Sequence, residues 1–177
     1  MASLMKDTAR FQKVACGDKE MLKSLNIDVI PVKQKRAQVV KWIKPIQERF
    51  KLKTNGSSNP GNSGAGGLLR DDAGNMVFAF SVDLGAGSNN AAELRAIIYG
   101  LKICQEQRIN RVELETNSQL VIKWISGAKC RVWYLEDFWE EAVKIFNECG
   151  HTIKHTSFRE GNAPADYLAK LGVQGKN

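Results

Sequence analysis

Residues 50–55 alternate between two kinds of side chain, and this alternation points to a domain that begins with a half-buried strand. Phe50, Leu52 and Thr54 fall on one face, and two lysines and Asn55 fall on the other. A period of two residues is the pattern of a β-strand with one face against a core. Asn55 therefore ends the alternation on the polar face, directly before the Gly-Ser-Ser of residues 56–58.

Two further strands are predicted immediately after this one. The Asn-Pro-Gly-Asn of residues 59–62 has the composition of a turn, and residues 64–70 return as a second strand. The glycines within 64–67 lack the Lys-Ser/Thr pair and the helix that a phosphate-binding loop needs, so we attribute them to close strand packing. A second turn at 71–75 precedes an apolar stretch at 76–82. Three strands joined by short turns predict an antiparallel meander.

The pattern becomes helical from residue 90. Apolar residues recur three and four positions apart from Leu94 to Cys104, with Asn89 or Asn90 as the expected N-cap. Residues 111–117 alternate again, and a strand that follows a helix in this way pairs in parallel with the first strand by a crossover. The remaining elements are predicted as helices at 118–126 and 134–149, a strand at 151–156 and a helix at 163–172. The prediction is an α/β domain with a five-stranded mixed sheet and flanking helices, in the order βββαβααβα.

Four short motifs follow one another in the order of these elements. They are Lys-Leu-Lys-Thr-Asn-Gly-Ser at 51–57, Ala-Ala-Glu-Leu-Arg-Ala at 91–96, Glu-Thr-Asn-Ser at 115–118 and Arg-Glu-Gly-Asn-Ala-Pro-Ala-Asp-Tyr-Leu-Ala-Lys at 159–170. They resemble motifs of the ribonuclease H superfamily, especially its plant retroelement-derived, reverse-transcriptase-associated branch. The resemblance implies a ribonuclease H-like fold. The reaction it implies is two-metal endonucleolytic hydrolysis of the RNA strand of an RNA/DNA hybrid.

The resemblance also assigns four catalytic positions, which in this chain are Asn55, Glu93, Asn117 and Asp166. The parallel crossover is expected to bring the strand ends that bear Asn55 and Asn117 side by side. The family motifs have a metal-binding Asp at both of those positions, so two of the four ligands are amides here. Glu93 and Asp166 remain as the metal ligands that the resemblance implies. Taken singly, the two asparagines and Asp166 also have ordinary explanations as turn, cap or first-turn residues.

The two amides bear directly on the cofactor, which the resemblance implies is a pair of Mg²⁺ or Mn²⁺ ions. Carboxylates must offset the four positive charges of such a pair, and an Asn offers a neutral carbonyl instead. Each missing charge at contact distance is worth about 4 kcal/mol at an effective dielectric of roughly 20. We therefore expect metal binding to be weak or lost, and hydrolysis to be impaired.

Three functions stay open at this point. The first is a domain that binds RNA/DNA hybrid but cuts it poorly or not at all. The second is an active ribonuclease, in which Glu93 and Asp166 hold metal with help from Glu115, or in which Asn55 deamidates to Asp beside Gly56. The third is a domesticated or relic retroelement fragment that acts through protein contacts. In the parent element of such a fragment, a reverse transcriptase would precede it.

A group of cations and aromatic residues between the second and third helices is the expected grip on nucleic acid. Its members are Lys123, Lys129, Arg131 and Trp133. The superfamily often has a basic, aromatic region here, where cations meet phosphates and aromatic rings pack on sugars. The plainer explanation is that the aromatic residues of this region, Trp124, Trp133, Phe138 and Trp139, only fill the core. Ser57 and Asn162, which belong to the first and last motifs, are assigned to the same nucleic-acid-binding surface.

The positive charge of the 177-residue chain is concentrated near its beginning. Residues 1–48 hold ten of the 26 Lys and Arg residues but five of the 19 Asp and Glu residues. We predict a basic, poorly ordered extension over 1–48 and a ribonuclease H-like domain over 49–174. The extension either neutralises phosphates or is a solvated tail, and charge alone does not choose between them.

Several protein classes are disfavoured by the sequence. No stretch reaches the roughly 18 apolar residues that a membrane span needs, and residues 1–17 lack the apolar core of a signal peptide. The four cysteines form no Cys-x-x-Cys pair, which favours reduced thiols over a zinc site. We therefore expect an intracellular monomer, in the nucleus or cytoplasm, with no membrane partner.

Overall fold

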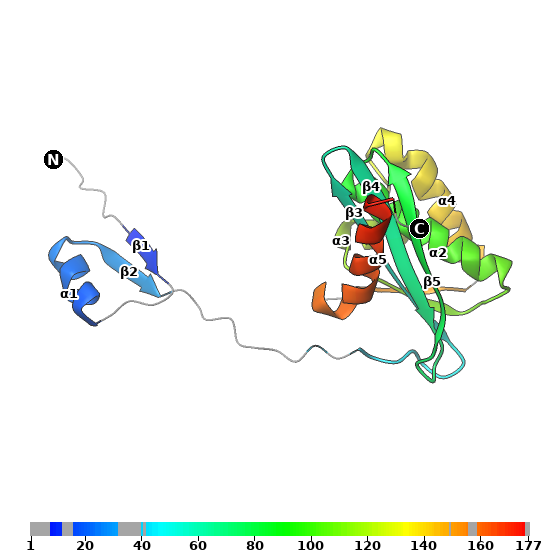
Figure 1. Cartoon of the computed structure of the whole chain (residues 1–177), viewed down its shortest axis with the longest axis horizontal. Coiled ribbons are helices and arrows are strands. Elements are labelled where there is room, and N and C mark those ends of the chain that lie inside the picture. The colour runs from blue at the N-terminus through cyan, green and yellow to red at the C-terminus, as the bar shows by residue number, and fades with distance from the viewer. Residues whose placement is uncertain are drawn as a thin grey trace. The chain divides into compact units, whose positions relative to one another are not determined.

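The computed structural model divides the chain into two compact units, Met1–Val39 and Val40–Asn177 (Figure 1). It describes residues 8–11, 16–31, 40, 42–148, 150–155 and 159–175. Among the helices of these described residues, none is both long enough and apolar enough to cross a bilayer.

The first unit contains a helix between two parallel strands. β1 (Thr8–Phe11) pairs in parallel with β2 (Asp28–Pro31), and α1 (Cys16–Ser24) lies between them in the chain. Part of the extension that was predicted to be poorly ordered is therefore regular structure. α1 begins at Cys16. It ends before Asn26, whose φ of 56° is left-handed and cannot continue a helix. The two strands are regular structure that the weak periodicity of this segment did not predict.

The second unit is built on one five-stranded sheet, with the strand order β5-β4-β3-β6-β7. Its strands are β3 (Phe50–Asn59), β4 (Asn62–Arg70), β5 (Met76–Gly85), β6 (Val112–Thr116) and β7 (Thr152–His155). The first three strands form the predicted antiparallel meander, and β6 and β7 add to it in parallel. The predicted parallel pairing of the first and fourth strands of this sheet is thus confirmed.

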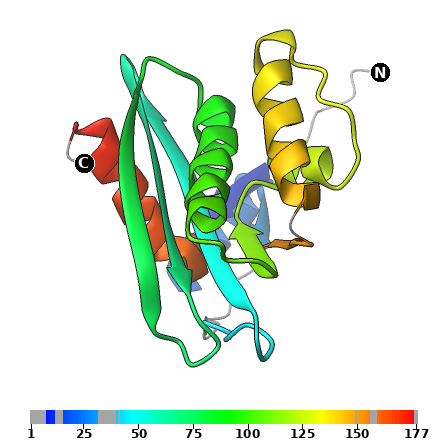
Figure 2. The same ribbon diagram turned by 90° about the vertical axis from the view of Figure 1, so that its right-hand side faces the viewer.

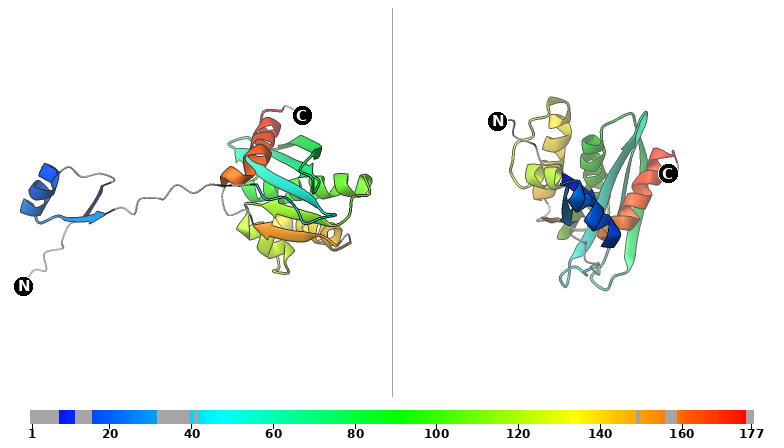
Figure 3. Two further views of the ribbon diagram at one scale, coloured as in Figure 1. Left: turned by 90° about the horizontal axis from the view of Figure 1, so that it is seen from below. Right: turned by 90° about the vertical axis from the view of Figure 1, so that its left-hand side faces the viewer.

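Helices cover both faces of the sheet (Figures 2 and 3). They are α2 (Asn89–Glu106), α3 (Gln119–Ile125), α4 (Glu136–Glu148) and α5 (Ala163–Val173), with short 3₁₀ turns η1 (Trp133–Leu135) and η2 (Arg159–Asn162) before the last two. In Figure 2, α2 and α4 lie on one face and α5 on the other. The N-cap of α2 is Ser88, whose hydroxyl accepts from the backbone N–H of Ala91, and not Asn89 or Asn90 as expected.

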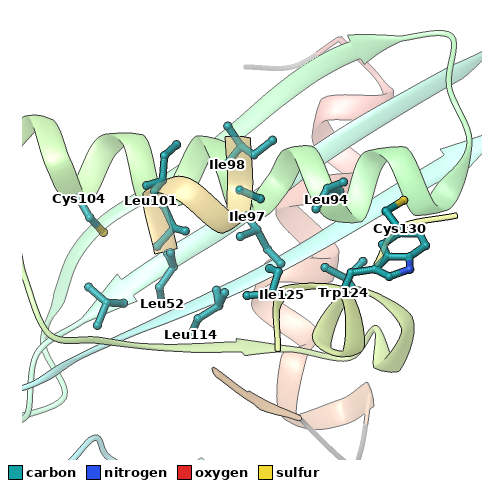
Figure 4. Close-up of a cluster of buried hydrophobic side chains, with 14 of the residues drawn as sticks. Leu52, Leu94, Ile97, Ile98, Leu101, Cys104, Leu114, Trp124, Ile125 and Cys130 are labelled. Carbon is teal, nitrogen blue, oxygen red and sulfur yellow. The ribbon is translucent and has the colours of Figure 1, made fainter. Parts of the chain in front are cut away.

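The main core lies between the sheet and α2 (Figure 4). Leu52 of β3 and Leu114 of β6 point toward Ile97 and Leu101 of α2, and all four side chains are fully buried. Burying a side chain of this size contributes about 1.5–3 kcal/mol. Trp124 of α3 is 5% exposed and belongs to this core, in agreement with the plainer explanation of the aromatic residues.

Glycines let the backbones of both flanking helices approach the sheet closely. A Cβ added at Gly56 of β3 would collide with the backbone of α2 at Ala92 and Glu93. A Cβ at Gly66 of β4 would collide in the same way with α5 at Ala169. The glycines of the second strand, attributed above to close strand packing, include one that lets β4 pack closely against α5, and Gly56 does the same for β3 and α2. These contacts fix the distance of α2 and α5 from the sheet.

Candidate active site

The carboxyl end of β6 lies beside the middle of β3, because these strands pair in parallel and β3 does not end at Asn55, as expected, but continues to Asn59. Lys53 is the register partner of Glu115, so Asn55 within β3 and Asn117, the residue directly after β6, each follow two residues later. All four predicted catalytic positions line one hollow of about 330 Å³, named here the Asn55 hollow. Its lining residues are Asn55, Gly56, Ser57, Ser58, Asn89, Glu93, Asn117 and Asp166.

Asn55 is 2% exposed, and its amide links β3 to α5. The Nδ2 atom donates to the carbonyl of Gly56 at 3.1 Å and to Oδ1 of Asp166 at 3.3 Å. Within the described residues, the buried Oδ1 atoms of Asn55 and Asn117 accept no hydrogen bond. Both asparagines therefore present neutral carbonyl oxygens to the hollow.

The carboxylate of Asp166 is engaged on both of its oxygens. Oδ1 accepts from Asn55, and Oδ2 lies 2.6 Å from the ammonium nitrogen of Lys170, one turn along α5. The i,i+4 spacing lets the Lys170 side chain reach back to the first turn of the helix. Sequence reasoning did not single out Lys170, although it ends the last motif at this spacing from Asp166.

Glu93 completes the acidic part of the hollow from the other side of β3. It stands in the first turns of α2, where the close approach at Gly56 holds the helix against the strand, and it is 4% exposed. The described residues that line the hollow thus supply two carboxylates and three side-chain amides, those of residues 55, 89 and 117.

This set of donors does not fit a pair of divalent metal ions. In the part of the chain that the structure describes, no group of three or more His, Cys, Asp or Glu side chains is arranged to hold a metal. Asp166 is already bound to an amide and an ammonium, and the amide carbonyls supply no charge. A two-metal site needs carboxylates to offset the positive charge of its ions.

Glu115, considered above as a helper ligand, is committed elsewhere. Its carboxylate pairs with Lys53 at 3.0 Å and with Lys51 at 3.4 Å. Both lysines are buried on β3, where they were expected only to mark the polar face. Glu115 therefore stabilises the sheet next to the hollow and is not placed to hold metal in it.

Glu113 is the second acid of this buried ion network. Burial alone would raise the pKa of its carboxyl. A hydrogen bond from the backbone N–H of Ile46, together with the hydrogen bond and charge of Lys154 and the charge of Lys51, instead holds the pKa below its usual value. The carboxylate is thus ionised, and it lies 3.1 Å from Lys154 and 3.7 Å from Lys51.

The predicted nucleic-acid-binding residues lie in three places: around Trp133, in the Asn55 hollow and, for Asn162, inside the domain. Lys123, Lys129, Arg131 and Trp133 are all exposed, and the last three line a shallow hollow beside α4. Trp133 is 84% exposed and meets Tyr134 edge to face, with ring centroids 5.7 Å apart, so it does not fill the core. Ser57 lines the Asn55 hollow.

Asn162 requires a correction. It is fully buried, and its Nδ2 donates to the backbone carbonyl of Thr54 at 2.9 Å. This bond ties the turn before α5 to β3. A side chain in that position cannot contact nucleic acid, and its place in the last motif is explained by structure.

Comparison with known proteins identifies relatives of this second unit. The family model described as reverse transcriptase-like matches residues 53–172. An Arabidopsis thaliana protein whose name assigns it provisionally to ribonuclease H is 35% identical over 100 residues. That match covers 55% of this chain but 16% of the Arabidopsis protein, so the chain spans a small part of its relative.

Solved structures agree with the sequence comparison. Ribonuclease H1 from the halophilic archaeon Halobacterium salinarum is 25% identical with a TM-score of 0.67, over 72% of this chain and 98% of that one. LC11 ribonuclease H1, solved in complex with RNA/DNA hybrid, is 26% identical with a TM-score of 0.66, over 71% of this chain and 97% of that one. The predicted fold class is thereby confirmed.

Proposed function

Because this chain belongs to the reverse transcriptase-like family and contains a ribonuclease H-like domain, we propose that it binds RNA/DNA hybrid and hydrolyses it poorly or not at all. The observation that supports impaired hydrolysis most directly is the hydrogen bond from Asn55 to Asp166. Family members of this type use divalent metals. An amide that donates to Asp166 occupies the carboxylate that such a metal would need.

Charge supports the same proposal. Acids at positions 55 and 117 would repel Glu93 and Asp166 unless a cation lay among them. With asparagines there, the hollow is stable without a cation, because an amide N–H donates to a carboxylate instead of opposing it. Two missing charges, each worth up to about 4 kcal/mol at contact distance, leave little affinity for metal.

Deamidation of Asn55 is a poor route back to an acid. The reaction needs the backbone nitrogen of Gly56 to attack the side-chain carbonyl carbon of Asn55. Both residues lie inside β3, in register with Gly66 and Ala65 of β4, and Asn55 is 2% exposed. The extended, paired backbone holds the reacting atoms away from the geometry of a cyclic intermediate.

Binding without metal is chemically reasonable at this hollow. The hydroxyls of Ser57 and Ser58 and the amide of Asn89 are donors that suit phosphate oxygens. The exposed group around Trp133 adds two cations and a stacking surface. The described part of the chain therefore has groups that suit a nucleic-acid backbone, while none of its acids are grouped to hold a metal pair.

A cleavage assay on the full chain tests the proposal. A labelled RNA/DNA hybrid is incubated with Mg²⁺ or Mn²⁺ and either the chain as written or its Asn55→Asp/Asn117→Asp variant. We expect the variant to cut at least about a hundredfold faster, because its two acids allow metal to bind. A hundredfold corresponds to a barrier that is lower by about 2.8 kcal/mol, at about 1.4 kcal/mol for each factor of ten. Asn89→Asp is the matched control, since it adds an acid to the same hollow away from the family positions and should not restore cutting. Equal cutting by the chain as written and the double variant would overturn the proposal.

A further inference from the structure

α5 covers only part of the sheet face on which it packs. Gly66 of β4 lies beneath the helix, but Lys53 and Leu68, a register pair further along the strands, line an open part of the face. There the face opens into a cavity of about 270 Å³, with Trp42 and Pro164 among its lining residues. This space, named here the Trp42 cavity, is distinct from the Asn55 hollow and shares no lining residue with it.

The floor of the Trp42 cavity is cationic. Lys51, Lys53 and Arg70 line it, and Glu160 is the one acid among those lining residues that the structure describes. Lys51 and Lys53 are 2% and 5% exposed, which is rare for lysine without compensation. Their ammonium groups share Glu115, and the remaining acid of the network, Glu113, is also paired with Lys154. Positive charge is therefore in excess here, in a region poorly screened by water.

The walls of the cavity are flat and apolar. The Arg70 guanidinium lies over the Trp42 ring, 5.3 Å from its centroid, which holds both groups in fixed orientation. Leu68 and Pro164 supply further apolar surface. The N-terminus of α5 adjoins the cavity at Pro164, and its dipole also favours a negative group.

We propose that the Trp42 cavity is a second binding site, for a small aromatic phosphate monoester. The ring packs against Trp42 and Leu68, and the phosphate meets Arg70 and the buried lysines. The volume, slightly below the roughly 300–1,000 Å³ of drug-sized sites, limits the ligand to one small ring system. Phosphate is favoured over carboxylate because its additional oxygen and charge suit Arg70 together with the two lysines, whose own charges Glu113 and Glu115 offset in part.

Nuclear magnetic resonance of the full chain tests this with 1-naphthyl phosphate as the probe. The indole N–H signal of Trp42, assigned by its disappearance in Trp42→Phe, should shift saturably. Three other compounds should each bind at least about tenfold more weakly than 1-naphthyl phosphate. They are 1-naphthol (no anion), inorganic phosphate (no ring) and 1-naphthoate (one charge). Equal binding by naphthoate would overturn the phosphate assignment, and an unmoved Trp42 signal would overturn the site.

Two variants separate the site from general cation–ring attraction. Arg70→Met keeps an apolar stem over Trp42 but removes the charge, and should weaken naphthyl phosphate binding at least about tenfold. Arg95→Met is the matched control, because Arg95 stands over the Phe138 ring at 5.5 Å on another surface, and it should change nothing. Should Arg70→Met lower the melting temperature, Arg70→Lys keeps the charge and should retain binding. Unchanged binding in a folded Arg70→Met protein would contradict the proposal.

The second site is independent of the function proposed above. Asn55→Asp/Asn117→Asp alters only the Asn55 hollow, so it should leave the Trp42 titration unchanged. If the affinity for 1-naphthyl phosphate, measured from the Trp42 signal, changes in this double variant, the probe binds at the Asn55 hollow and the second site is overturned.

Discussion

The side-chain amide of Asn55 donates to the carboxylate of Asp166, with 3.3 Å between Nδ2 and Oδ1, and so joins β3 to α5 across 111 residues of sequence. The same carboxylate is paired with Lys170 at 2.6 Å. Together these contacts give Asp166 the partners that a metal ion would otherwise provide. The Asp166 carboxylate in the hollow is thus stabilised by a hydrogen bond from Asn55 and an ion pair with Lys170.

Metal affinity should increase when acids replace the asparagines at positions 55 and 117. We expect the chain as written to bind Mn²⁺ with millimolar or weaker affinity and Asn55→Asp/Asn117→Asp to bind at least about tenfold tighter, because two charges are restored where each is worth up to about 4 kcal/mol. Isothermal titration calorimetry measures both, with Asn89→Asp as control. Equally tight binding by all three proteins would show that charge does not limit the site.

Binding of hybrid and its cleavage should respond in opposite directions to the same substitutions. Without divalent metal, the chain as written should bind RNA/DNA hybrid at least as tightly as the double Asp variant, since two acids facing phosphates are absent. With Mg²⁺, the variant alone should cut. Filter binding at moderate salt compares the affinities. If the chain shows no preference for hybrid over double-stranded DNA, protein contacts become the better explanation of its function.

The first unit should contribute to the salt dependence of binding if it contacts phosphates. Residues 1–39 hold eight Lys and Arg residues and four Asp and Glu residues. Each phosphate contact that the deletion removes should flatten the slope of log K against log salt by about 0.9. Hybrid binding by residues 40–177 and by the full chain, measured over a range of salt, gives both slopes. Equal slopes would show that the first unit makes no phosphate contacts in the complex.

The deletion should end after Val39 and not after residue 48. Lys51 donates to the carbonyl of Ile43 at 2.6 Å, and the backbone N–H of Ile46 donates to Glu113 at 3.1 Å. Removing 40–48 would leave buried charged groups without these partners. We expect a chain that begins at residue 49 to have a melting temperature several °C below that of one that begins at residue 40, since each orphaned group costs about 1–3 kcal/mol.

His151 should make the fold less stable in mild acid. Burial lowers the pKa of its imidazole from 6.5 to about 4, and Nδ1 accepts from the Val112 N–H at 3.1 Å. The unfolded chain takes up a proton near pH 6.5, whereas the folded chain stays neutral until about pH 4, so stability is lost as pH falls through this window. The loss should be about 2 kcal/mol at pH 5 relative to neutral pH.

Urea unfolding at pH 7.5 and pH 5 measures this loss. His151→Asn keeps an acceptor for the Val112 N–H but cannot titrate, so its stability should change less between the two pH values. A variant that loses as much stability as the parent chain would assign the effect to other groups.

The sequence predicted the order and type of the elements well, because the alternation at 50–55 and the helical spacing at 94–104 are strong local signals. It did not predict that the lysines of β3 are buried. Alternation shows which face of the strand a side chain takes. Burial of the polar face depends on the 42–48 segment and on Glu113 and Glu115 of β6, which the strand register places opposite Lys51 and Lys53. Asn162 was misassigned for a similar reason, since a motif position does not show whether its side chain serves the fold or a ligand.

The glycine contact that seats α2 on β3 has a consequence for how this lineage can change. Gly56 fixes the height of Glu93 above the strand through backbone contact, so the spacing of the hollow does not depend on whether position 55 is an amide or an acid. Asn and Asp have nearly the same shape, and their codons differ at the first base alone. One point mutation in each of two codons would place four acids in the hollow while the Gly56 contact with α2 stays the same. Exchange between amide and acid at each of these positions is therefore a single-base step for the gene.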